Sequence, residues 1–156
     1  MAKRNIFRGL AAVLALGMCM TGLAGCGSEK RADGKTEIEV VSYKPEAVKA
    51  FEKIEKRFNE THDDIHLKIS SPNEAMTILK TRFIREDYPD IIAIGGDINY
   101  SNFLDADLFE DISGLDEVQT IKQAYLDMDK ELEFIPKDGT YALPYVANAA
   151  GILYNK

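Results

Sequence analysis

Four polar or aromatic residues stand at the ends of predicted β-strands, where a small molecule could be held: Tyr43, Asp97, Tyr145 and Asn148. Aromatic rings pack on the C–H faces of sugar rings, and carboxylates or amides hydrogen-bond the hydroxyl groups. A concave site built from such groups selects a polar small molecule. Composition alone slightly favours a second interpretation, in which Tyr43 and Tyr145 are half-buried core aromatics and Asp97 is a helix N-cap.

Other residue groups that could carry chemistry fit their known patterns poorly. His62 and His66 have a spacing that can bind zinc on a helix, but here they straddle a predicted helix end and the next strand. The acidic cluster lacks the order of a calcium loop, because Phe109 and Glu110 occupy the positions where that loop needs Asp, Asn or Gly. No nucleophile–base motif, Walker loop or dinucleotide fingerprint occurs. We therefore expect no catalytic residue, no metal site and no cofactor.

The hydrophobic pattern indicates an alternating order of strands and helices. We predict strands over 37–43, 65–69 and 91–94, a helix over about 46–60, and a second helix that starts with a capping box at 71–74 and ends before Pro89. The run 91–94 is continuously apolar, as in a strand that is buried on both faces. Further helices are expected near 100–106 and 118–132, and extended segments over 141–144 and 151–154.

A β-α-β-α-β order at this spacing favours an open, largely parallel α/β sheet. Ligands of such sheets bind beyond the carboxyl ends of the strands. Two loops are expected at that edge, residues 42–45 after the first strand and residues 95–97 after the third.

Charge and cysteine content narrow the class of protein. The chain has 156 residues and a formal net charge of -7, and its first 25 residues hold three basic side chains and no acidic one. Residues 26–156 therefore carry a more negative net charge than the full chain. This charge argues against nucleic-acid binding and against binding to anionic lipid through a polybasic segment. The two cysteines are Cys19 and Cys26, so the body that follows has no disulfide framework.

The N-terminus has the features of a secretory signal. A basic segment precedes an apolar run over residues 9–20, which is too short to span a bilayer comfortably. The following Leu23-Ala24-Gly25-Cys26 resembles the lipobox of bacterial lipoproteins, in which the peptidase cuts before the acylated cysteine. We expect a signal peptide over 1–25, a flexible tether over 26–36 that starts at lipidated Cys26, and a folded body over 37–156. An uncleaved membrane anchor is the alternative, and it would also leave the body outside the cytoplasm.

Four segments, in the same order as in a known family, carry a resemblance: Pro89–Ile94, Leu108–Ile112, Asp138–Tyr145 and Gly151–Lys156. In chain order they resemble four segments of bacterial extracellular solute-binding proteins of carbohydrate ABC transporters. These segments are the P-D-[IV]-[IV] strand, the G-L-[FL]-x-[DP]-[IL] segment, the G-x-x-Y-x-[IL]-P segment and the [LI]-x-Y-N-K strand. That family is similar to maltose-binding protein. The resemblance covers residues 37–156, although Asp107 replaces the usual glycine and the chain has no Trp for sugar stacking.

The resemblance implies a periplasmic-binding-protein-like (type II) α/β fold, in which two lobes close on a ligand at a hinge. We expect this chain to hold an incomplete N-terminal lobe, with the second lobe absent. Carried over by position, Ser42, Tyr43 and Lys44 would face the cleft, Asp97 would be a sugar-binding carboxylate, and Asn148 a polar cleft residue. Tyr145 would also bind the ligand. Either tyrosine takes the place of Trp, or the aromatic platform lies elsewhere.

The implied function is that of a monomeric substrate-binding component. It would be lipid-anchored at Cys26 to the outer face of the cell membrane, capture a sugar or oligosaccharide, and deliver it to the ABC transporter permease without doing chemistry. The alternative from another class is a short surface lipoprotein, complete at 156 residues, with a structural or partner-binding role.

Overall fold

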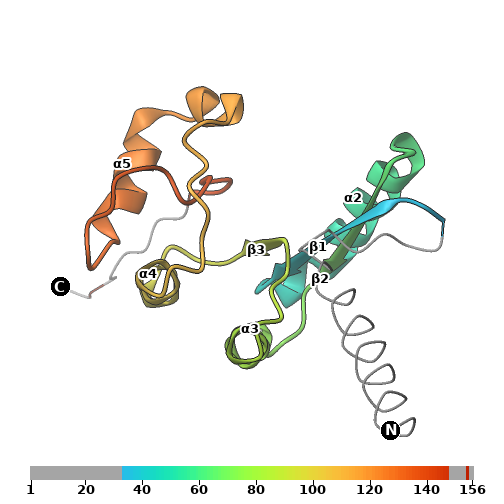
Figure 1. Cartoon of the computed structure of the whole chain (residues 1–156), viewed down its shortest axis with the longest axis horizontal. Coiled ribbons are helices and arrows are strands. Elements are labelled where there is room, and N and C mark those ends of the chain that lie inside the picture. The colour runs from blue at the N-terminus through green and yellow to red at the C-terminus, as the bar shows by residue number, and fades with distance from the viewer. Residues whose placement is uncertain (1–32, 148–153, 155–156) are drawn as a thin grey trace, which may run out of the picture.

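The computed structural model describes residues 33–147 and Tyr154. In chain order the elements are β1 (Thr36–Ser42), the 3-10 turn η1 (Pro45–Ala47), α2 (Val48–Thr61), β2 (Ile65–Ser70), α3 (Ala75–Ile84), β3 (Ile91–Ala93), α4 (Ile98–Asp105), the 3-10 turn η2 (Asp116–Thr120) and α5 (Gln123–Glu131) (Figure 1).

The three strands form one parallel sheet in the order β2-β1-β3. Along β1, Thr36 lies opposite Ile65 of β2, and Ser42 at its other end lies opposite Ala93 of β3. The parallel α/β sheet expected from the alternation of strand and helix patterns is therefore confirmed. All three carboxyl ends meet at one edge, which is where the loops that follow β1 and β3 were expected.

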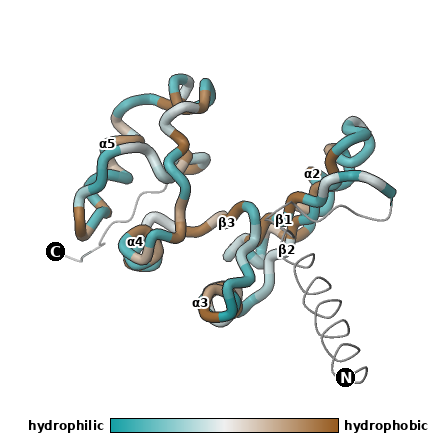
Figure 2. Tube along the Cα trace, in the orientation of Figure 1, coloured by the Kyte–Doolittle hydropathy of each residue, from teal (hydrophilic) through white to brown (hydrophobic). Residues whose placement is uncertain are grey.

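The third strand differs from its prediction. β3 is hydrophobic throughout (Figure 2), but the Ile91 side chain is 51% exposed. Among the described residues β3 pairs with β1 alone, so it lies at the edge of the sheet that these residues form. The expectation of burial on both faces was wrong, because an apolar run reports hydrophobicity and not which neighbours cover it.

Helix α3 packs against one face of the central strand. Side chains two apart in a strand share a face, and α3 meets two such positions of β1. Leu79 contacts buried Val41, and Arg82 forms a bidentate ion pair with Glu39 at 3.0 and 2.7 Å. The pair raises the pKa of the Arg82 guanidinium, chiefly through the hydrogen bond to Glu39. Packing and charge together hold α3 below the strands in Figure 1.

Side chains of α2 cover the free edge of β2. The Asn59 amide donates to the Leu67 carbonyl at 2.8 Å and accepts from the Leu67 N–H at 2.7 Å, while Glu55 Oε2 accepts from the Ile69 N–H at 2.7 Å. Positions four apart lie on one face of a helix, and alternate residues of a strand present their backbone groups to one edge. Two side chains thus pair backbone groups that could otherwise recruit another strand.

We predict that Asn59→Ala lowers the free energy of unfolding by about 1–2 kcal/mol, because the N–H and the carbonyl of Leu67 each lose the hydrogen bond that the Asn59 side chain makes. It should also promote aggregation, since the edge of β2 becomes available for pairing. Urea unfolding and light scattering measure the two effects. The matched control is Glu60→Ala, on the same helix, which removes an exposed ion pair with Lys56 at 3.8 Å; it should change stability by less than about 0.5 kcal/mol. Equal effects of the two changes would contradict the role of Asn59.

Two helix starts differ from prediction. The capping box at residues 71–74 does not form, because α3 begins only at Ala75 and its N-cap residue makes no side-chain cap hydrogen bond. The Ser71 hydroxyl instead donates to the Ser42 carbonyl at 3.2 Å, which ties the end of β2 to the end of β1. The helix expected over 118–132 is divided into η2 and α5, because Ile121 and Lys122 take extended backbone angles.

The extended segments near the end of the chain are only partly described. Residues 141–144 belong to no helix or strand of the described part of the chain. Of the segment 151–154, all but Tyr154 lies outside the described residues.

Aromatic contacts join α3, which packs on the sheet, to α4 and the residues that follow it. Phe103 of α4 meets Phe83 of α3 edge to face, with centroids 5.0 Å apart, and Phe109 contacts both Phe103 and Tyr100. Edge-to-face contacts of this kind add stability beyond that of burial alone. This cluster positions α4, whose first turn follows directly on the loop after β3.

Candidate functional site

The loops after β1 and β3 lie side by side. The Tyr43 N–H donates to the Ala93 carbonyl at 3.1 Å, which extends the ladder between the two strands by one bond. Ser42 is fully buried, and its hydroxyl accepts from the Lys44 N–H at 3.2 Å. Ser42 therefore shapes the loop from inside, while Tyr43 and Lys44 form its surface.

Gly95 allows Tyr43 and Asp97 to approach one another. A methyl group placed on Gly95 would lie 3.0 Å from Tyr43 Oη and 3.3 Å from Asp97 Oδ2. Both oxygens thus border the same point in space, which only a residue without a side chain leaves open. The two residues stand 54 positions apart in the sequence, and both lie at the carboxyl-end edge of the sheet.

Asp97 also caps α4, as the second interpretation of the sequence proposed. Its Oδ1 accepts from the Asn99 N–H at 2.8 Å and from the Asn99 side-chain amide at 3.0 Å. The cap occupies one carboxylate oxygen and fixes the rotamer. The other oxygen, Oδ2, is the one beside Tyr43, so the two interpretations concern different atoms of one residue.

Lys44 and Tyr145 complete the group that the structure describes. Lys44 Nζ lies 4.5 Å from the centre of the Tyr43 ring and 3.7 Å from Glu46. Interaction with the Tyr43 hydroxyl is the main reason that the pKa of Lys44 is raised, and Tyr145 is close enough to contribute. Tyr145 is 61% exposed, which contradicts its interpretation as a half-buried core aromatic, whereas Tyr43 does pack partly against the core. Asn148 lies outside the described residues.

The turn after β2 belongs to the same edge, and the sequence reasoning missed it. An open hollow of about 140 Å³ at this turn is lined by Tyr43, Asn73 and Glu74, among others. The rule that located the other two loops, namely that sites gather at the carboxyl ends of parallel strands, applies to this turn as well. The Ser-Pro-x-Glu pattern predicts a helix cap at this position, and that prediction does not point to a ligand site.

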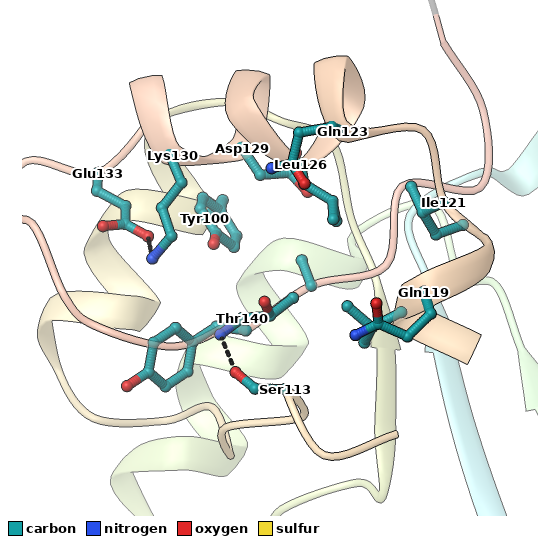
Figure 3. A pocket seen from close by; sticks show the side chains of 13 residues that line it. Tyr100, Ser113, Gln119, Ile121, Gln123, Leu126, Asp129, Lys130, Glu133 and Thr140 are labelled. Carbon is teal, nitrogen blue, oxygen red and sulfur yellow. Dashed lines mark hydrogen bonds and ion pairs between the residues drawn. The ribbon is translucent and has the colours of Figure 1, made fainter. Parts of the chain in front are cut away.

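A larger cavity of about 320 Å³ shares no residue with these loops (Figure 3). It lies between α4, α5 and the segments around Ser113 and Thr140. Glu133 is almost fully buried there, paired with Lys130 Nζ at 2.9 Å. Asp129 Oδ2, in contrast, is buried without a hydrogen-bond partner among the described residues. Loss of water raises the pKa of Asp129 to about 6 and that of Tyr100 to about 12.

Comparison with known proteins identifies the family. A sequence model for the family described as bacterial extracellular solute-binding proteins matches residues 37–156, which is most of the chain. The chain belongs to this family. It is 30% identical over 145 residues to a multiple sugar-binding protein of Streptococcus mutans, and this match covers 90% of the chain and 33% of that relative.

Solved solute-binding proteins share the fold. The apo-form of RafE from Streptococcus pneumoniae matches with a TM-score of 0.55 and 28% identity, over 65% of this chain and 25% of RafE. RafE in complex with raffinose matches with a TM-score of 0.54 and 30% identity, over 60% of this chain and 24% of that one. The chain therefore spans between a quarter and a third of the length of these relatives.

Within the described part of this solute-binding protein, no group of three or more His, Cys, Asp or Glu side chains is arranged to hold a metal ion. His62 stacks on Phe58 with ring centroids 3.8 Å apart, at the end of α2, while His66 lies in β2. Across residues 33–147, no helix has the length and apolar character needed to cross a bilayer.

The buried Asp129 makes a pH-dependent contribution to stability. Its folded-state pKa of about 6 lies above the ordinary value of 3.8, so the native state holds the proton more tightly than the unfolded state does. Stability should therefore fall as pH rises from about 4 to about 6, and stay lower above that range. Asp129→Asn removes this loss, and we predict about 1 kcal/mol of added stability at pH 7, since the partly open side chain is screened by solvent.

Urea unfolding of wild type and Asp129→Asn at pH 4 and at pH 7 tests this prediction. The two proteins should differ at pH 7 and converge at pH 4. Asp127→Asn, an exposed position on the same helix, is the control. A constant difference between wild type and Asp129→Asn at both pH values would assign the effect to packing instead of charge.

Proposed function

We propose that this chain is part of a substrate-binding component of an ABC transporter, which captures a sugar or oligosaccharide outside the cell and delivers it to the membrane permease. Family membership supports the solute-binding role. The choice of a sugar rests on the names of the relatives, a multiple sugar-binding protein and RafE in complex with raffinose. The role is one of binding and release, so it needs neither a catalytic residue nor a cofactor.

The single observation that carries the proposal is the convergence of Tyr43 and Asp97 at Gly95. An aromatic ring beside a carboxylate oxygen offers a sugar both a stacking face and a hydroxyl acceptor. The backbone bond to Ala93, the helix cap and the buried Ser42 hold these groups in place before a ligand arrives. Preorganisation of this kind reduces the entropy that binding costs. Lys44, Tyr145 and Asn148 are proposed as further ligand-binding residues.

Calorimetry with the full-length protein tests the sugar assignment. A panel should include raffinose, maltotriose, sucrose and the component monosaccharides. We expect saturable binding of at least one oligosaccharide. No binding across the panel would contradict a sugar ligand, and amino acids or peptides would then be the next classes to titrate.

We also propose that Cys26 carries a lipid that anchors the mature protein outside the cell, after removal of residues 1–25. The acidic body offers no electrostatic hold of its own on anionic lipid. Cys26→Ser removes the acylated thiol that the peptidase requires, so it should abolish incorporation of labelled palmitate and leave the precursor uncleaved, with a larger mass on a gel. Cys19→Ser, which lies within the proposed signal, is the matched control and should change neither result.

A further inference from the structure

Asp111 and its two following residues hold the backbone of Thr140. Asp111 Oδ1 accepts from the Thr140 N–H at 3.1 Å and from the Ser113 N–H at 2.9 Å. The Ser113 hydroxyl donates to the same carboxylate oxygen and accepts from the Thr140 N–H at 2.8 Å, as the dashed line in Figure 3 shows. The Ile112 N–H donates to the Thr140 carbonyl at 2.8 Å. Both backbone groups of Thr140 are therefore paired, and these four residues are here called the Asp111 latch.

Gly139 allows the Asp111 carboxylate to lie directly against the chain. The φ angle of Gly139 is +104°, and a methyl group placed there would lie 2.6 Å from Asp111 Oδ2. Another residue would be strained both by the backbone angle and by its contact with the carboxylate. The hydrogen bond from the Ser113 hydroxyl is the main reason that the pKa of Asp111 is lowered. The carboxylate is therefore charged at neutral pH, which strengthens the hydrogen bonds that it accepts.

The Asp111 latch is the last anchor of the chain before the proposed sugar site. From Tyr141 to position 147, the one hydrogen bond among the described residues is that of the Tyr141 hydroxyl, which donates to the Asp138 carbonyl at 2.8 Å within the same turn. Tyr145 follows Thr140 by five positions and lies near Lys44. A segment with no anchor of its own takes its direction from the last fixed residue. The latch therefore determines where Tyr145 lies relative to the loop after β1.

We propose that Asp111 is a positioning residue of the sugar site, which makes no contact with the ligand but fixes the segment that carries Tyr145. This inference rests on the proposed sugar-binding function and on the proposed role of Tyr145. Without the carboxylate, residues 141–147 adopt several directions, and the ligand must select one of them. That selection lowers the observed affinity.

A double-mutant cycle in the full-length protein tests this role, with calorimetry on the sugar of the panel that binds most tightly. We expect Asp111→Ala to weaken binding about fivefold and Tyr145→Ala about tenfold. The double variant should bind no more weakly than Tyr145→Ala alone, because Asp111 acts through Tyr145. Asp111→Asn keeps the oxygen that accepts all three hydrogen bonds, so its affinity should stay within about twofold of wild type.

Hydrogen exchange of the backbone amides in residues 138–147 measures the order of the segment directly. Exchange should be faster in Asp111→Ala and unchanged in Asp111→Asn. Gly139→Ala should reproduce both effects of Asp111→Ala, because the added methyl displaces the carboxylate. Where Asp111→Ala does not fold, Gly139→Ala takes its place in the cycle. The matched control is Asp116→Ala, an exposed carboxylate at the start of η2, which should change neither measurement.

Two outcomes would overturn the inference while the sugar-binding function stands. The first is unchanged affinity in Asp111→Ala. The second is a double variant whose loss equals the sum of the two single losses in free energy, which would show that Asp111 acts independently of Tyr145. If wild type binds no sugar of the panel, the inference falls together with the sugar assignment. The titration of wild type therefore separates failure of the positioning role from failure of the proposed function.

Discussion

Tyr43→Ala should weaken sugar binding by the full-length protein about a hundredfold, which corresponds to about 2.7 kcal/mol. The change removes the aromatic face and the hydroxyl group that borders Gly95 beside Asp97. Large losses on truncation are typical of aromatic residues at the centre of a binding site. Calorimetry with the tightest sugar of the panel measures the effect.

Two further variants separate the contribution of the Tyr43 ring to sugar binding from that of its hydroxyl group. Tyr43→Phe keeps the ring and should lose only about tenfold, the value of one hydrogen bond. Gly95→Ala keeps Tyr43 but places a methyl group 3.0 Å from its hydroxyl, so it should also weaken binding. Gly114→Ala, where no atom lies within 4 Å of the added methyl, is the control. Unchanged affinity in both Tyr43 variants would remove this residue from the site.

Leu79→Ala should lower the free energy of unfolding by about 3 kcal/mol. Leu79 is 0% exposed and lies between Val41 of β1 and Ala75, so truncation leaves a cavity at the centre of the contact between α3 and the sheet. Tyr43 and Met76 pack on the same cluster, and we therefore expect a second, smaller effect on ligand affinity. Urea unfolding measures the first effect and calorimetry the second.

The neighbouring Ile78→Ala provides the control for Leu79. Ile78 is 39% exposed on the same helix, and its truncation should cost less than about 1 kcal/mol. A destabilisation as large as that of Leu79→Ala would mean that the loss is not specific to the core contact, because alanine favours a helix more than leucine or isoleucine does. Stability that is unchanged in Leu79→Ala would contradict the core described here.

Periodicity predicted the strands and helices of the sheet region well. β1 and β2 alternate, α2 carries one apolar face, and the order of these patterns favoured a parallel sheet, which is what forms. The errors concern features that depend on neighbours. β3 is as apolar as a central strand, but Ile91 is 51% exposed and β3 pairs with β1 alone among the described residues. Ser71 bonds to Ser42 across the sheet instead of capping α3.

The sequence by itself determined which residues could meet at the site, because side chains that follow parallel strands must gather at one edge. That rule selected Tyr43 and Asp97 without knowledge of the strand order. Only the tertiary structure decided how they meet: it buried Ser42, divided the Asp97 oxygens between a helix cap and the site, and placed the turn after β2 beside Tyr43. These features depend on which atoms come within a few ångströms across the sheet, and local sequence patterns carry no record of distances between segments so far apart in the chain.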